Sequence, residues 1–209
     1  MRGSRLIGGA GWTLAAALSL ATALFSYRYL APSAPLVPPN VAGNAYAAIV
    51  LPVHAVSAAT ALLLGPLQFW RSLRSRRPRA HRLVGRLYVL ACMLGGASGF
   101  VLALGSTAGP IAGAGFATLA LAWIYVTGRG VRLAVQGRYD EHRRWMIRSF
   151  ALTFAAVTLR LLLILAPAAP IGSTDAYRAI AWLCWVPNLL IVEACFAWAA
   201  PRFVGLEKA

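Results

Sequence analysis

Six apolar runs of roughly 20 residues each constrain this chain more than any other feature, because a helix of that length crosses the hydrocarbon core of a bilayer. We predict spanning helices over Leu6 to Tyr27, Tyr46 to Trp70, Leu83 to Leu104, Ile111 to Val131, Trp145 to Ala166 and Ala179 to Ala199. The expected fold is all-α: a polytopic membrane helical bundle of about six transmembrane helices. The connections are short, so residues 1–209 are expected to form a single integral-membrane domain.

Composition supports a membrane protein. Hydrophobic residues make up 60% of the chain and charged residues 12%. A water-soluble globule of 209 residues needs more polar surface than this sequence supplies.

The net charge of the chain is +15, and its positive residues are distributed unevenly between the connections. Arginines crowd the connection between the second and third runs and that between the fourth and fifth, whereas the other connections carry almost none. By the positive-inside rule, this alternation places both termini and both basic connections in the cytoplasm. We therefore expect the basic loops to contact anionic lipid headgroups on the cytoplasmic face of the membrane. Nucleic acid is not an expected partner, because these loops lack interleaved aromatic residues for stacking bases.

The first apolar run has a second interpretation. A basic start followed by an apolar stretch also describes a signal peptide, which would leave five spans after cleavage. The run is longer than the usual apolar region of a signal peptide, about 7 to 15 residues, which favours an uncleaved anchor.

Two polar side chains fall in the half of the bundle that faces away from the basic loops. His54 lies in the second run, and Arg160 lies in the outer part of the fifth. A guanidinium keeps its charge, so it must find an acceptor or reach the interface by snorkelling. The sequence allows an outer-leaflet pocket shared by His54 and Arg160. The alternatives are a structural or snorkelling role for Arg160 and simple packing for His54.

Two charged residues fall towards the cytoplasmic ends of other runs. Glu193 is the one acid predicted within a span, and Arg86 in the third run is its expected partner. Pro187 precedes Glu193 in the sixth run, where a missing backbone donor predicts a kink. Such an ion pair is structural in the first instance.

The remaining histidines flank the basic connections at matching depth. His81 occurs in "RPRAHRLVGRLYVL" and His142 in "EHRRWMIRSFALTFAAVTLRL". On a helix, His142 shares one face with Met146, Ser149, Thr153 and Arg160. Asp140 and Glu141, just before His142, are expected to cap the fifth helix at the positive end of its dipole and to orient the imidazole.

These two segments, with "LLLGPLQF" after His54, resemble the bacterial membrane-protein family catalogued as domain of unknown function 2306. The resemblance covers about residues 46–165 and more loosely the rest. It implies a helical bundle of uncharacterised activity in the bacterial cytoplasmic (inner) membrane. On architecture alone, the arrangement is also similar to transmembrane b-type cytochromes, in which histidines on different helices hold a haem.

The His81 and His142 pair therefore has three interpretations. Both could ligate one haem b, with arginines pairing to its propionates. They could hold a divalent metal together with Glu141, although the spacing has no diagnostic signature. They could instead pack and cap helix starts, with the arginines on lipid phosphates and Trp145 in the aromatic belt. A two-haem arrangement is excluded, because His54 has no histidine partner on its own side.

Three functions remain open at this point. The first is a small redox protein that binds haem. The second is a transporter or channel with His54, Arg160 and Glu193 along a polar path. The third is an assembly protein whose basic loops recruit a partner. The sequence shows none of the GxSxG, HExxH or phosphate-loop motifs of hydrolases and nucleotide-binding enzymes.

Overall fold

The computed structural model describes residues 9–30, 39–168 and 172–199, which form helices joined by short turns, with no strand among them. Six helical segments are long and apolar enough to cross a membrane: Gly9–Leu30, Ala47–Phe69, Pro78–Leu104, Pro110–Val135, Tyr139–Leu165 and Ser173–Ala199. The predicted all-α bundle of six spans is confirmed.

Several spans begin earlier than predicted. The third starts at Pro78, ahead of Leu83, and the fifth starts at Tyr139, ahead of Trp145. The added turns are rich in arginine, which is a good helix former, and Pro78 is pre-organised for the first position of a helix. Helical structure thus continues past the apolar run, so hydropathy alone places these ends too late.

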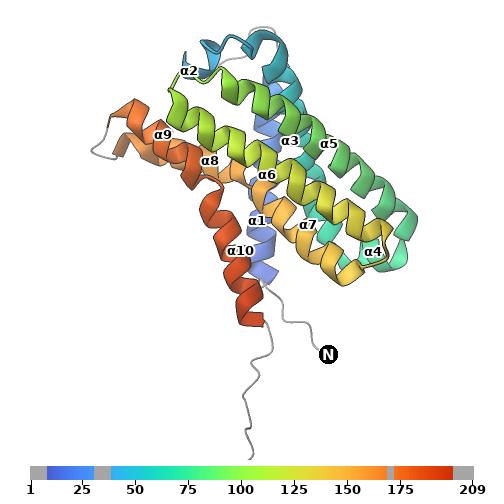
Figure 1. The fold of residues 1–209 in the computed structure, drawn as a ribbon. Coiled ribbons are helices and arrows are strands. Elements are labelled where there is room, and N and C mark those ends of the chain that lie inside the picture. The colour runs from blue at the N-terminus through green and yellow to red at the C-terminus, as the bar shows by residue number, and fades with distance from the viewer. Residues whose placement is uncertain (1–8, 31–38, 169–171, 200–209) are drawn as a thin grey trace, which may run out of the picture.

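Four helices form the centre of the bundle and pack in the order α3 (Ala47–Phe69), α5 (Pro78–Leu104), α6 (Pro110–Val135) and α7 (Tyr139–Thr153). They run side by side in Figure 1, and α1 (Gly9–Ser26) lies against α3. Close approach depends on small residues: a Cβ at Gly96 of α5 would meet the Ile124 side chain of α6 at 2.5 Å. The turn from α5 to α6 uses Gly109, whose φ of 89° favours glycine.

The last two spans are each broken into two helices. In the fifth, α7 ends at Thr153 and α8 (Ala155–Leu165) follows a turn at Phe154. In the sixth, α9 (Ser173–Leu183) is followed by α10 (Val186–Ala199), which takes a different direction and packs on α7 (Figure 1). The kink predicted near Pro187 is confirmed, with the break at 184–185, because proline cannot donate to the preceding turn.

Asn188 connects the two breaks. Its amide nitrogen lies 3.3 Å from the Ala151 carbonyl of α7, 3.0 Å from the Thr158 hydroxyl of α8 and 3.1 Å from the Cys184 carbonyl. A side chain that bonds a helix carbonyl replaces the donor of the next turn, which is a recognised cause of kinks. Short connecting segments complete the described chain: η1 (Tyr27–Leu30), α2 (Pro39–Ala42), α4 (Arg71–Arg76) and η2 (Ala166–Ala168).

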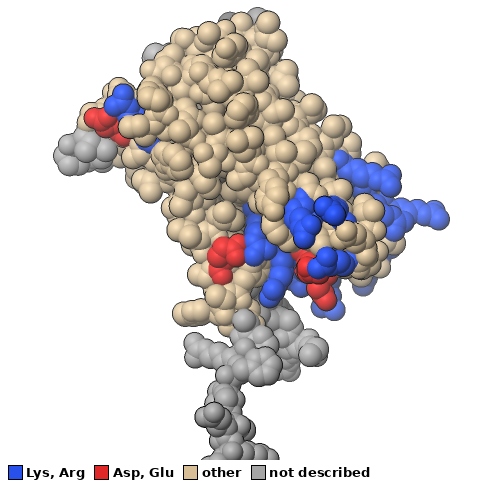
Figure 2. Space-filling model, in the orientation of Figure 1, with Lys and Arg blue, Asp and Glu red and all other residues tan. Residues whose placement is uncertain are grey.

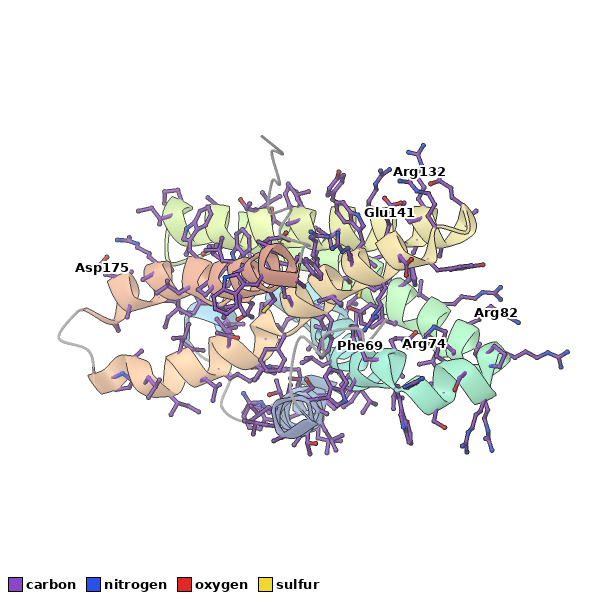
Figure 3. The ribbon with its side chains drawn as sticks, turned by 90° about the horizontal axis from the view of Figure 1, so that it is seen from below. Phe69, Arg74, Arg82, Arg132, Glu141 and Asp175 are labelled. Carbon is purple, nitrogen blue, oxygen red and sulfur yellow. The ribbon has the colours of Figure 1, made fainter. Side chains whose placement is uncertain are left out.

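The charged residues divide the bundle into two ends. Arginines gather at one end, over α4, the start of α5 and the turn between α6 and α7 (Figure 2). We call this the basic end. In Figure 3, Arg74, Arg82 and Arg132 lie there, and Asp175 lies at the far side of the bundle, which we call the opposite end. That the basic end faces the cytoplasm stays a prediction of the positive-inside rule.

Candidate functional site

A cavity of about 240 Å³ lies among the spans in the half of the bundle nearer the opposite end. Residues of α1, α3, α5, α6, α7, α8 and α9 line it, most of them Ala, Leu or Gly. The structure places both His54 and Arg160 on its wall.

His54 is held in place by α5. Its Nδ1 lies 2.9 Å from the Gly95 carbonyl oxygen, and because a carbonyl only accepts, Nδ1 carries the hydrogen. In the neutral imidazole, Nε2 is then an acceptor with no partner among the described residues. A Cβ at Gly99 would come within 3.0 Å of the ring, so glycine at this position leaves room for His54.

Arg160 is part-buried on α8 and uses two of its five N–H groups. One terminal nitrogen donates to the Ala156 carbonyl at 2.8 Å, and the other donates to Ser26 Oγ at 2.7 Å. Ala156 precedes Arg160 by one turn, so the guanidinium folds back along the helix towards the bundle's interior. The structure therefore favours a hydrogen-bonded Arg160 over one that snorkels outward.

Two other polar residues at the cavity wall, Ser26 and Asn44, already form hydrogen bonds within the protein. Ser26 donates to the Thr22 carbonyl, and Asn44 donates to the Leu102 carbonyl while accepting from the Tyr46 amide. His54 Nε2 and the guanidinium of Arg160 both keep hydrogen-bonding capacity to spare at this wall.

A cluster of hydroxyl groups closes the cavity on its inner side, where Thr153 and Trp123 line the wall. Thr153 donates to the Ser149 carbonyl at 2.9 Å and accepts from the Trp123 indole at 3.0 Å. Its one hydrogen is used, so Tyr88, also 2.9 Å away, must donate to it. Ser149 then donates to Tyr88 at 2.9 Å, and Thr127 donates to Ser149 at 2.7 Å.

All members of this hydroxyl cluster (Tyr88, Thr127, Ser149, Thr153) are buried and bonded, and they tie α5, α6 and α7 together. Ser149 and Thr153 belong to the predicted stripe of α7. Thr127 and Trp123 were missed, since nothing in the local pattern of α6 marks that face as the partner of α7.

The pairing expected for Glu193 is wrong. Its carboxylate forms a two-pronged ion pair with Arg148 of α7, at 2.5 and 2.8 Å, and Arg148 also stacks over Phe196. Arg86 lies exposed on α5. The break in the sixth span directs α10 onto α7, which brings Glu193 to Arg148.

His81 and His142 lie in the first turns of α5 and α7 at the basic end, close enough to interact electrostatically. His142 Nδ1 is 2.8 Å from the Gly130 carbonyl, whereas His81 Nδ1 is buried with no partner among the described residues. No group of three His, Cys, Asp or Glu residues that could hold a metal occurs in the described ranges. Glu141, the third ligand in the metal interpretation, pairs with Arg138 at 2.6 Å.

The capping prediction for α7 is also corrected. Asp140 and Glu141 lie in its first turn, where negative charge favours the helix dipole. The N-cap residue, however, is Arg138, and no side chain caps the helix there.

Comparison with known families identifies the group to which these features belong. The sequence profile of DUF2306, described as a predicted membrane protein, matches residues 51–196. The chain belongs to the DUF2306 family. The match extends the resemblance beyond residue 165, through the sixth span with Asn188 and Glu193. Comparisons with curated proteins and with solved structures found no match.

Proposed function

We propose that this DUF2306 protein binds a small, lipid-soluble molecule in the cavity beside His54 and Arg160. The observation that carries the proposal is the cavity itself, a mostly apolar space whose wall holds one imidazole and one guanidinium with spare hydrogen-bonding capacity. Small-molecule sites typically combine an apolar lining with a few convergent polar groups of this kind.

Filling the cavity tests the proposal. Leu159 lines the cavity, and Leu161, two residues further along α8, is 44% exposed on the outer surface. Leu159→Trp and Leu161→Trp therefore add the same bulk inside and outside the site. We expect mass spectrometry of extracts from the purified proteins to find a bound small molecule in the wild type and in Leu161→Trp, but not in Leu159→Trp. An identical set of molecules in all three proteins would contradict the proposal.

Transport through a polar path has weaker support from the same geometry. The hydroxyl cluster at the inner wall has its hydrogen bonds committed, and Glu193 lies elsewhere, paired with Arg148. Solute flux in proteoliposomes that Arg160→Leu abolishes would establish transport nonetheless.

Haem b at His81 and His142 is a second candidate, favoured by one observation. His142 directs Nδ1 at the Gly130 carbonyl, which leaves Nε2 for a metal, the arrangement that orients histidine ligands. His81 lacks such an acceptor among the described residues, so only half of the site fits. When bound, a haem would supply one-electron redox chemistry.

An absorption spectrum decides the haem candidate. Oxidised and dithionite-reduced protein, purified from cells with ample haem, should show a Soret band that His142→Ala removes. A spectrum without that band eliminates the haem.

A further inference from the structure

Arg160 is a positive charge that no acid of the described chain neutralises. Four acids are described: Glu141, Asp175 and Glu193 pair with Arg138, Arg178 and Arg148, and Asp140 lies in the first turn of α7. The hydrogen-bond partners of Arg160 are a carbonyl and a hydroxyl, both neutral. An unneutralised charge within a membrane span is costly, and such residues commonly mark binding sites.

Arg160 does not reduce that cost by snorkelling to the membrane interface. Its side chain bonds one turn back along α8 and across to the end of α1, so the charge remains at the cavity wall. Three of its N–H groups are left for another acceptor, in the planar array that matches a carboxylate or a phosphate.

We infer that the ligand is an amphipathic anion, with a carboxylate or phosphate head group on Arg160 and an alkyl chain along the Ala- and Leu-lined wall. This inference rests on the proposed function and specifies its ligand class. His54 Nε2, as an acceptor, suits a hydroxyl or a protonated acid oxygen of the same head group. The ion pair forms where little water competes, which strengthens it relative to a surface pair.

Binding of matched probes tests the head group. Isotope-labelled decanoate, decyl phosphate and decanol share an alkyl chain and differ in charge. With the wild type in lipid nanodiscs, and empty nanodiscs as background, we expect at least one of the two anions to bind tenfold or more tightly than decanol. The tighter anion identifies the head group as carboxylate or phosphate.

Variants of the arginine assign the effect to its charge. Arg160→Gln should bind the anions no more tightly than decanol, whereas Arg160→Lys should retain most of the preference. Arg178→Gln is the matched control: Arg178 is also near the opposite end but is paired with Asp175, so its variant should behave as the wild type. Size-exclusion profiles and circular dichroism establish that each variant is folded.

The outcomes separate the two proposals. Equal binding of anions and decanol by the wild type, lost in Leu159→Trp, overturns the anionic head group and leaves the cavity as a binding site. Binding of no probe above the level of Leu159→Trp overturns both. Retention of the anion preference in Arg160→Gln also overturns the assignment to Arg160.

Discussion

Arg148 and Arg160 belong to the same membrane span, and their surroundings are opposite. Arg148, on α7, meets a carboxylate at two points and stacks over an aromatic ring. Arg160, on α8 beyond the break, meets neutral oxygens at the wall of a cavity. The charge of Arg148 is neutralised by Glu193 and helps to hold α10 against α7. The charge of Arg160 has no acidic partner among the described residues, so we assign its neutralisation to a bound ligand. A polar residue in a span is thus interpreted by its partners rather than by its depth.

The hydroxyl cluster separates these two regions, and its removal should have the largest effect. Tyr88 is fully buried and bonds two side chains of α7, so Tyr88→Ala should lower the free energy of unfolding by about 3 kcal/mol through a cavity and broken hydrogen bonds. Tyr88→Phe removes the two hydrogen bonds of the hydroxyl and should cost only about 1 kcal/mol, at roughly 0.6 kcal/mol for each bond within a membrane. Unfolding by sodium dodecyl sulfate, followed by tryptophan fluorescence, measures both. Equal effects of the two variants would show that the ring contributes little.

Removing the unpaired charge should stabilise the protein. Arg160→Met keeps an apolar side chain of similar length and relieves the cost of a buried cation, so the ligand-free protein should gain about 2 kcal/mol. The same unfolding titration measures the gain. A loss of stability would mean that the bonds to Ala156 and Ser26 outweigh the cost of burial, and the contrast with Arg148 would fail.

The equivalent change at the paired arginine should have the opposite sign. Arg148→Met leaves Glu193 without its partner, and the protein should lose about 1 kcal/mol, a modest value because the Glu193 side chain is 44% exposed. The double variant Arg148→Met with Glu193→Gln should recover part of the loss. Failure to recover any of it would indicate that the stacking of Arg148 on Phe196, rather than the ion pair, is what matters.

An ion pair at the surface should have the smallest effect on stability among these arginine variants. Arg138 and Glu141 are each about half exposed, at 50% and 47%, so Arg138→Ala should change stability by less than about 0.5 kcal/mol. Thermal unfolding at low and high salt measures it, and a larger, salt-sensitive loss would show that this pair holds the start of α7.

Prediction from sequence succeeded wherever a local property carried the information. Apolar length identified six spans, and the helical spacing of His142, Ser149 and Thr153 indicated an inward face on α7. It failed for partners on distant helices: Glu193 pairs with Arg148 and not with Arg86. The break before Pro187 was foreseeable from proline, but the direction that α10 takes after it depends on Asn188 bonding two other helices.

By itself, the sequence determined the class of the protein, the number of its spans, the separation of charge between connections and the family, because each depends on composition or short-range order. The tertiary structure alone decided which charges are paired, how the hydroxyl groups share their hydrogens and that a cavity remains beside His54 and Arg160. These three features depend on how the surfaces of different helices pack together, through ridges, grooves and helix breaks. The local sequence of a single helix does not specify that packing. The cavity is where such packing leaves space, so no single helix could have revealed it.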